Sequence, residues 1–304
     1  MQQSDKIIEI KQLVKHYGKF RAVEDVSFDV YQGDVFGFLG PNGAGKSTTI
    51  RTMLSLISAT SGEIKIFGKE LRANRREILS EIGCIVEKPD FYKFLSAQKN
   101  LEIFARLSGK NISTKKILEV IDYVGLKGRE KDKVSGYSHG MKQRLGIAQT
   151  LIHDPKLIIL DEPTTGLDPQ GIIDIRNLIL QLKNEQNKTV LLSSHLLSEI
   201  ELIANRMVII NKGKTIVQGN VRELLDEEEL LVSFTVDNID KAINVLKNKS
   251  AEVLQSVAGN IINLHISKED IPKFNRHFME NEIQVFAIES KRKLEDYFLK
   301  LINN

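Results

Sequence analysis

The residues best suited to chemistry lie in a glycine-rich segment at positions 40–47. It reads Gly-Pro-Asn-Gly-Ala-Gly-Lys-Ser and fits the phosphate-loop pattern G-x-x-x-x-G-K-[ST] in full. Its glycines let the backbone bend so that successive N–H groups point at phosphate oxygens, and the following helix adds the positive end of its dipole. Lys46 can then reach the β- and γ-phosphates of a nucleotide, and the Ser47 hydroxyl can ligate Mg²⁺. The predicted nucleotide contacts are Gly40, Pro41, Asn42, Gly43, Ala44, Gly45, Lys46, Ser47 and Thr48.

Two adjacent carboxylates, Asp161 and Glu162, follow the apolar run 157–160. This run predicts a buried strand, and open α/β sheets bind their ligands at the carboxyl ends of their strands. Asp161 is therefore expected to hold Mg²⁺ through water, and Glu162 to polarise an attacking water as general base. Apolar runs before two acids are common by chance, so it is the pairing with the phosphate loop that makes the prediction specific.

Two further motifs create a family resemblance. Residues 138–144 read Ser-His-Gly-Met-Lys-Gln-Arg and precede the stretch 161–169, Asp-Glu-Pro-Thr-Thr-Gly-Leu-Asp-Pro, while Ser194-His195 follows the next predicted strand. Together with the phosphate loop, they resemble the nucleotide-binding subunits of ABC transporters over roughly residues 5–221. The resemblance implies an ATPase that uses ATP and Mg²⁺, pairs head to tail with a second copy, and drives a separate integral-membrane permease.

The resemblance also implies roles for single residues. Ser138 and Gly140 would close over ATP bound to the partner subunit, and Tyr17 would stack on adenine. Asp168 would join the two active sites across the dimer, and His195 would contact the γ-phosphate and orient the water. From the residues alone, Ser138 is a helix cap, Tyr17 a turn tyrosine and His195 a structural histidine, and these readings stay open.

The chain departs from the family pattern at two places. Residues 137–141 read Tyr-Ser-His-Gly-Met where the family most often has Leu-Ser-Gly-Gly-Gln, so the bulk of His139 puts the tightness of the closed dimer in doubt. Glu87 replaces the glutamine that ligates Mg²⁺ and links to the permease; a glutamate keeps the acceptor oxygen but loses the N–H₂ donors. This Glu87, with the residues after it, resembles ATPases of the bacitracin and lantibiotic resistance type, which favours export.

The elements that must position these residues follow from hydrophobic periodicity. Alternating strands and helices predict an α/β fold with a parallel, doubly wound sheet that also contains an antiparallel β region. The predicted strands are 7–14, 23–30, 35–39, 63–68, 82–86, 157–160, 189–193 and 207–210. The predicted helices are 46–57, 171–184 and 196–204, with further helical spacing between 95 and 124.

The predicted domains are an ABC ATPase core at 5–221 with a helical subdomain at about 89–152, an acidic linker at 222–229, and a C-terminal domain at 230–304. In the C-terminal part, strands at 230–236, 253–257, 261–266 and 283–288 alternate with helices at 239–248 and 269–279. This β-α-β-β-α-β order predicts a small ferredoxin-like domain, followed by a helix at 291–302. Such a domain could regulate the ATPase or serve only for packing and dimerisation.

Composition sets the outer limits. The 304 residues are 41% hydrophobic and 27% charged, which excludes a disordered chain and a disulfide scaffold. No apolar run approaches the 20 or so residues of a membrane span, and the first residues lack the apolar core of a secretory signal. The lone Cys84 indicates a reducing compartment and is expected to be buried in its strand. We therefore expect a cytoplasmic protein, held on the inner face of the membrane by the permease.

Charge is spread unevenly. The net charge is +3, and residues 222–304, with 11 basic and 15 acidic side chains, carry −4. No basic stripe of the kind found in nucleic-acid binders appears, so no nucleic-acid partner is expected.

Two other classes of function remain open from the sequence. One is a related ATPase that serves DNA repair or translation. Repair members insert long coiled coils, whereas the helical region here spans only about 60 residues, and translation members usually carry two cassettes, whereas this chain has one. The other is a regulatory module that binds nucleotide without turnover, against which Glu162 and His195 argue.

Overall fold

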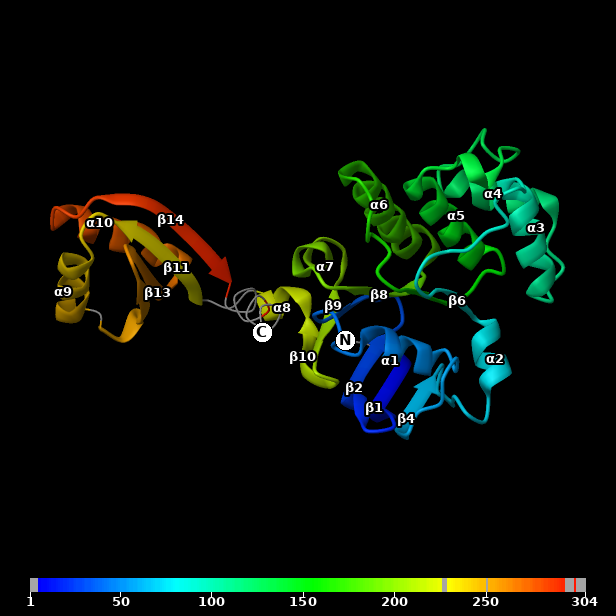
Figure 1. Ribbon diagram of the computed structural model, residues 1–304, viewed down its shortest axis with the longest axis horizontal. Coiled ribbons are helices and arrows are strands. Elements are labelled where there is room, and N and C mark those ends of the chain that lie inside the picture. The colour runs from blue at the N-terminus through cyan, green and yellow to red at the C-terminus, as the bar shows by residue number, and fades with distance from the viewer. Residues whose placement is uncertain (1–4, 226–228, 250, 293–297, 299–304) are drawn as a thin grey trace. The chain divides into compact units, whose positions relative to one another are not determined.

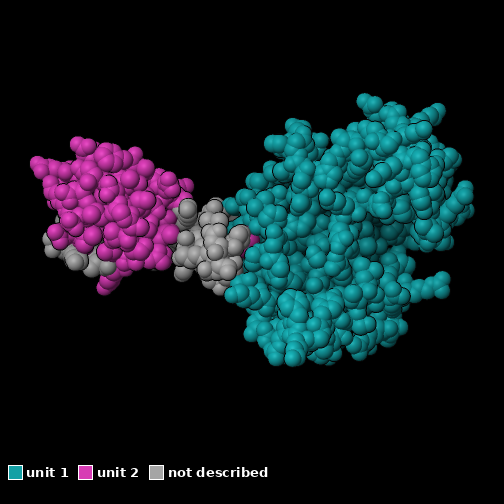
Figure 2. Space-filling model, viewed as in Figure 1, with its two compact units in different colours: residues 1–220 teal, residues 221–304 magenta. Residues whose placement is uncertain are grey.

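The structure, a computed structural model, describes residues 5–225, 229–249, 251–292 and 298. The chain divides into two compact units, residues 1–220 and 221–304 (Figure 2). Each unit has its own hydrophobic core, so each is described by itself.

The first unit is built on a ten-stranded mixed sheet with the order β5-β4-β1-β2-β10-β9-β3-β8-β7-β6 (Figure 1). The section β9-β3-β8-β7-β6 is parallel, whereas β1 pairs antiparallel with both β2 and β4. The strands are β1 (Lys6–Tyr17), β2 (Phe20–Tyr31), β3 (Val35–Leu39), β4 (Ser61–Ile66), β5 (Lys69–Glu70), β6 (Ile82–Ile85), β7 (Leu157–Leu160), β8 (Thr189–Ser194), β9 (Arg206–Asn211) and β10 (Lys214–Asn220). The predicted combination of parallel and antiparallel strands is confirmed.

Seven α-helices of this unit accompany the sheet within the described residues. They are α1 (Lys46–Met53), α2 (Arg75–Ser80), α3 (Ala97–Leu107), α4 (Thr114–Tyr123), α5 (His139–Leu151), α6 (Pro169–Gln186) and α7 (Leu197–Ile203). Helices α3, α4 and α5 pack against one another, and α5 also packs on β6 (Figure 1). Helices α6 and α7 pack on β3 and β8.

Strand β3 is buried at all five residues, and its two faces differ. Phe36 and Phe38 pack against Phe28 of β2, with ring centroids 5.5 and 5.2 Å apart. On the other face, a Cβ on Gly37 would lie 2.3 Å from the Ile200 side chain of α7. This packing leaves β3 no freedom to shift, so the loop that follows it starts from a fixed point.

Helix α5 lies unusually close to the loop after β6. A Cβ on Gly146 would lie 2.7 Å from Pro89 Cγ, and one on Gly83 would lie 2.4 Å from the Thr150 carbonyl oxygen. Only glycine allows these two approaches. The helix is therefore seated on β6 and Pro89 without a gap.

Two sequence expectations for this unit are wrong. The helix predicted over 46–57 ends at Met53, because Ser55 adopts a left-handed φ of 54° and the N–H groups of Ser55 and Leu56 bond back to Thr52 and Arg51. This is a Schellman ending with serine in the place of the usual glycine. Cys84 lies on β6 as predicted, but β6 is an edge strand and the side chain is exposed.

The second unit holds a four-stranded antiparallel sheet with the order β12-β13-β11-β14. After the short helix α8 (Val221–Leu225), its elements are β11 (Glu229–Val236), α9 (Ile239–Lys249), β12 (Leu254–Ala258), β13 (Ile261–Ser267), α10 (Ile271–Glu280) and β14 (Val285–Arg292). Its core contains Leu246 of α9 and Phe278 of α10, whose ring lies 5.3 Å from that of Phe234.

Parts of two predicted segments lie outside the described residues. Within the predicted linker 222–229, α8 takes up residues 222–225, Glu229 begins β11, and 226–228 are outside the description. Of the helix predicted at 291–302, residues 291 and 292 belong to β14 and the others, except Phe298, are outside it. No helix in the described parts of the chain has the length and apolar character that a membrane crossing requires.

Candidate functional site

The phosphate loop leaves β3 and enters α1, as predicted. Gly45 takes a left-handed φ of 105° directly before the helix, a conformation that an L side chain strains. Its Cβ would also lie 2.6 Å from the Ala22 carbonyl oxygen, and a Cβ on Gly40 would lie 2.5 Å from that of Ile210. The loop is thus held tightly from behind, and among the described residues no side chain caps the start of α1. The first N–H groups of α1 are left available to an anion.

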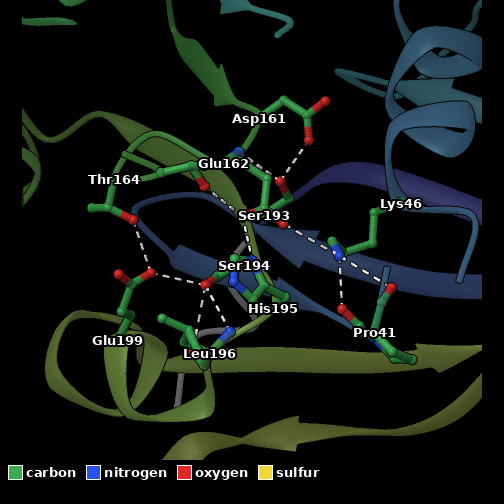
Figure 3. A network of polar contacts seen from close by, with 12 residues as sticks. Pro41, Lys46, Asp161, Glu162, Thr164, Ser193, Ser194, His195, Leu196 and Glu199 are labelled. Carbon is green, nitrogen blue, oxygen red and sulfur yellow. Dashed lines mark hydrogen bonds and ion pairs between the residues drawn. The ribbon is translucent and has the colours of Figure 1, made fainter. Parts of the chain in front are cut away.

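Lys46 is buried, with only 6% of its side chain exposed, yet its ammonium group is well provided with partners. Nζ donates to the carbonyl oxygens of Gly40 at 2.7 Å and Pro41 at 3.3 Å. It also forms an ion pair with Glu162 Oε1 at 3.3 Å. The loop therefore curls around its own lysine, and that lysine faces the predicted general base (Figure 3).

The Glu162 carboxylate contacts three other side chains of the site. Its Oε2 accepts a hydrogen bond from His195 Nδ1–H at 2.8 Å and another from the Thr165 hydroxyl at 3.0 Å. Burial acts to raise the pKa of Glu162, but the bond from His195 and the charge of Lys46 outweigh it, so this pKa lies below its ordinary value. At neutral pH, Glu162 is a carboxylate that can accept a proton.

The backbone of Glu162 is itself unusual, with a left-handed φ of 49°. Its N–H donates to the Ser193 hydroxyl at 2.8 Å, and that hydroxyl donates to Asp161 Oδ1 at 2.6 Å. Ser193 and Asp161 are both buried. One serine thus holds both the Asp161 carboxylate and the backbone of Glu162.

A cavity of about 390 Å³ opens over these groups. It is lined by Phe20, Ala22, Pro41, Asn42, Gly43, Gly45, Lys46, Ser47, Thr48, Glu162, Thr165 and His195. The lining combines a cation, hydroxyls and a glycine-rich backbone, and so fits the phosphates of a nucleotide. Residues from β3, β7 and β8 reach it from the carboxyl ends of neighbouring parallel strands, as the sheet rule requires.

The donor set also bears on the predicted metal. The described residues hold no cluster of three or more His, Cys, Asp or Glu side chains that could bind a metal by themselves. Mg²⁺ is commonly bound through one or two carboxylates together with substrate phosphates and water. A buried Asp161 beside a cavity lined by Ser47 fits that mode.

Several predicted nucleotide and metal contacts are absent from the described cavity lining, namely Tyr17, Gly40, Ala44, Glu87 and Asp161. Tyr17 ends β1 with its ring half exposed and Lys15 Nζ 4.9 Å from the ring centroid. Phe20, which pairs with Tyr17 across the β1–β2 turn, lines the cavity instead. Glu87 is mostly exposed and forms an ion pair with Arg51 of α1. The roles predicted for Tyr17 and Glu87 stay predictions.

The predicted dimer residues lie apart from the described cavity lining. Ser138 caps α5, accepting from the Met141 N–H at 3.2 Å, and Gly140 has no described atom within 4 Å of an added Cβ. Asp168 caps α6 in the same way, accepting from Gly171 at 3.1 Å. His139 donates from Nδ1 to the Gly166 carbonyl at 3.0 Å, which ties the start of α5 to the segment before Asp168.

Phe20, Thr165 and Ser193 belong to the site although the motifs did not identify them. Thr165 lies inside the quoted 161–169 motif, and a hydroxyl three residues after a carboxylate is a usable signal. Ser193 is the next-to-last residue of the buried strand β8 (Thr189–Ser194), where a polar residue already indicates a hydrogen-bond partner. Phe20 had no signal beyond its place two residues after Gly18.

Known proteins are similar to this chain in sequence and in fold. The family model for "ABC transporter" matches residues 23–165. The chain is 44% identical over 301 residues to the bacitracin transport ATP-binding protein BcrA of Bacillus licheniformis, covering 97% of both chains. It is 43% identical to the lantibiotic transport ATP-binding protein SrtF of Streptococcus pyogenes, over 74% of this chain and 98% of that protein. A solved ATP-binding subunit of an ABC transporter superposes with a TM-score of 0.64 at 29% identity, over 72% of this chain and 91% of that one.

Proposed function

The chain belongs to the ATP-binding subunits of ABC transporters, which hydrolyse ATP to drive transport, and we propose that it acts as a homodimer powering a separate exporter permease. One observation carries the proposal for its site: the Glu162 carboxylate is held between Lys46 and His195 and lines the same cavity as the glycine-rich loop. The alternatives, a non-transport ATPase or a regulatory module without turnover, gain no support from the relatives.

ATP would lie along the phosphate loop. The N–H groups at the start of α1 and the Lys46 ammonium would bind the phosphates, and Ser47 and Thr48 would add hydroxyls. Tyr17 is proposed to stack on adenine, with Phe20 beside it across the turn. Ser47, Asp161 and Glu87 are the proposed Mg²⁺ ligands. When bound, Mg²⁺ neutralises charge on the β- and γ-phosphates.

In the hydrolysis step, water attacks the γ-phosphate in line with the leaving oxygen. The Glu162 carboxylate, which its lowered pKa keeps ionised, would orient this water and accept its proton. His195 would hold Glu162 in place and contact the γ-phosphate. The Lys46 ammonium would exchange its ion pair with Glu162 for one with the phosphate.

The second half of each site is proposed to come from a partner chain. Ser138, Gly140 and Asp168 are exposed or open, and the described lining of the chain's own cavity does not include them. A head-to-tail homodimer would bring the start of α5 from one chain over the cavity of the other. No nucleic acid is needed as a partner.

The cargo is inferred from the relatives. Because the chain resembles proteins named for bacitracin and lantibiotic transport, we infer export of a peptide antibiotic or a similar compound. The permease is proposed to bind near Glu87, where the aromatic pair Tyr92 and Phe94 is exposed. The chain would then lie at the cytoplasmic face of the membrane.

We infer further that the second unit is a ferredoxin-like domain at 230–304, joined to the ATPase core at 5–221 through the linker 222–229. Its β-α-β-β-α-β order and the sheet order β12-β13-β11-β14 support this. Its net charge is negative, whereas the net charge of the first unit is positive.

Replacement of Glu162 by Gln tests the proposal directly. The variant should bind ATP normally but lose hydrolysis by about 100-fold or more, the usual contribution of a general base. Light scattering on this variant should show a monomer without nucleotide and a dimer with ATP and Mg²⁺. A monomer in both conditions, with ATP bound, would contradict the homodimer. Unimpaired hydrolysis would contradict the assignment of Glu162.

A further inference from the structure

A further carboxylate, Glu199, is bonded to the segments that carry Glu162 and His195, here called the catalytic pair (Figure 3). It comes from the first turn of α7, four residues after His195. Its Oε2 accepts two hydrogen bonds, from the Thr164 hydroxyl at 2.9 Å and from the Ser194 hydroxyl at 2.8 Å. One oxygen atom therefore joins the loop after β7 to the end of β8.

The two hydroxyls that meet on Glu199 are close neighbours of the reacting groups in the chain. Thr164 follows Glu162 by two residues, and Ser194 directly precedes His195. The Ser194 hydroxyl also accepts from the Leu196 N–H at 3.0 Å, so the backbone on both sides of His195 is held. Glu199 thus fixes the two segments that carry the catalytic pair, and it touches neither Glu162 nor His195 in any contact that the structure describes.

Burial raises the free-energy cost of losing the hydrogen bonds to Glu199. Ser194 is 1% exposed, and Thr164 and Glu199 are partly buried. Hydroxyl donors to a carboxylate form stronger bonds than neutral pairs do, and a buried hydroxyl that loses its acceptor keeps its full desolvation cost. Without Glu199, the Thr164 hydroxyl loses this acceptor and the Ser194 hydroxyl keeps only the Leu196 carbonyl at 3.5 Å. The direct link between the two segments is then lost, and the Ser193 bonds remain.

The catalytic bond is sensitive to such a separation. His195 Nδ1 and Glu162 Oε2 are 2.8 Å apart, and hydrogen bonds weaken steeply beyond normal distance and angle. The Ser193 hydroxyl fixes the Glu162 backbone on one side of β8, and the Ser194 hydroxyl reaches Glu199 on the other. The strand end is therefore held from both faces, and Glu199 supplies one of the two holds.

We propose that Glu199 is a positioning residue that sets the spacing of Glu162 and His195 for ATP hydrolysis by bonding Thr164 and Ser194 together. The inference rests on the proposed roles of Glu162 and His195. It predicts a loss of turnover without a loss of ATP affinity, because Glu199 is not among the described residues of the cavity lining.

Four variants of the full chain test this by steady-state ATP hydrolysis and by equilibrium binding of ATP. Glu199→Ala should lower kcat about tenfold to a hundredfold and leave KM and the ATP dissociation constant within about twofold, the scale expected when catalytic groups are misplaced by up to 1 Å. Glu199→Gln keeps an acceptor oxygen and should recover most of the lost rate. Ser198→Ala, an exposed position on the same helix, is the matched control and should behave as wild type. Glu162→Gln completes the set.

The outcomes separate the inference from the proposed function. If Glu162→Gln hydrolyses ATP normally, the proposed site is wrong and the Glu199 variants carry no meaning for it. If Glu162→Gln is inactive while Glu199→Ala keeps its kcat, only the positioning role is overturned. Parallel losses of kcat and ATP affinity in Glu199→Ala would overturn it too, because they would show that Glu199 supports the whole cavity and does not act on the catalytic pair alone.

A double-mutant cycle keeps the test valid should Glu199→Ala fold poorly. Thr164→Val replaces the hydroxyl with a methyl group of similar size and removes one of the two bonds. It should lower kcat several-fold in the wild-type and Glu199→Gln backgrounds, where an acceptor remains, and should lower it no further in Glu199→Ala, where the bond is already lost. Thr164→Val with wild-type kcat would overturn the proposal.

Discussion

Helices α1 and α5 begin with the same kind of sequence, a glycine-containing turn, but their first turns are built differently. Helix α1 follows Gly45 in a left-handed conformation and has no side-chain cap among the described residues. Helix α5 follows Ser138 in an extended conformation, and the serine hydroxyl accepts from Met141. The phosphate loop thus leaves its N–H donors to a ligand, whereas α5 satisfies one of them itself.

In the proposed dimer, each ATP site has two parts, which are here called the α1 half and the α5 half. The two helix starts differ as these two parts require. The α1 half is rigid: its glycines touch backbone carbonyls, and its lysine is buried among acceptors. The α5 half is exposed and complete without a ligand. Under the proposed function, the first half would bind the nucleotide and the second would contact it in the partner chain once it is bound.

Gly45→Ala should break the α1 half, with the largest effect. The left-handed φ strains alanine by about 1–2 kcal/mol, and the new Cβ would meet the Ala22 carbonyl at 2.6 Å. The displaced loop should lose about two of its expected N–H bonds to phosphate, and each such bond contributes about 1.5–3 kcal/mol. ATP affinity should therefore fall about a hundredfold or more. Titration with a fluorescent ATP analogue measures the affinity, and thermal unfolding shows the strain. Affinity within a factor of three of wild type would contradict the tight fit of the loop.

Ser138→Ala should affect the α5 half at two levels. Loss of the cap should lower the free energy of unfolding by about 1 kcal/mol. ATP binding by the monomer should be unchanged, while hydrolysis should fall about tenfold if the hydroxyl also reaches the partner's ATP. Ser113→Ala removes the equivalent cap of α4 and is the control: it should match the loss of stability and keep full hydrolysis. Equal hydrolysis in the two variants would leave Ser138 as a helix cap only.

Gly140→Ala sharpens the comparison with Gly45→Ala. The added Cβ meets no described atom within 4 Å, so the monomer should fold with unchanged or slightly higher stability, by up to about 1 kcal/mol. In a Glu162→Gln background, the ATP-dependent dimer should weaken about threefold to tenfold, because the methyl group would lie where the partner's phosphate approaches. Sedimentation at several concentrations gives the dimer constant. An unchanged constant would show that this surface of α5 stays free.

The smallest effect concerns the far end of α5, where His153 Nε2–H donates to the Ile82 carbonyl at 3.1 Å. Burial is the main reason that the pKa of His153 is lowered below 6.5. The unfolded chain therefore takes up this proton first, so stability is full above pH 6.5 and falls as the pH drops toward the folded pKa. His153→Gln should remove a slope of at most about 1.4 kcal/mol per pH unit, measured by urea unfolding across this range. A variant with the same slope as wild type would contradict this.

The sequence predicted the parts of the molecule that rest on local pattern. The phosphate loop between a buried strand and a helix, the carboxylates after β7 and most strands of both units follow from periodicity and spacing, whereas β5 and β10 were not predicted. The contacts that depend on packing were missed. Cys84 was expected to be buried because its neighbours are apolar, but the sheet order makes β6 an edge. Thr164, Ser194 and Glu199 are 35 residues apart at most in sequence, and only the pairing of β7 with β8 brings them together.

Pro89 has a mechanical consequence. It follows Glu87 by two residues and lies against Gly146, where no side chain larger than hydrogen fits. Helix α5 is 13 residues long, about 20 Å, and Ser138 stands at its start. A contact with no slack transmits displacement instead of absorbing it. We therefore expect a displacement of the segment after Glu87 to tilt or shift α5 as a rigid helix and so to move Ser138 at its start.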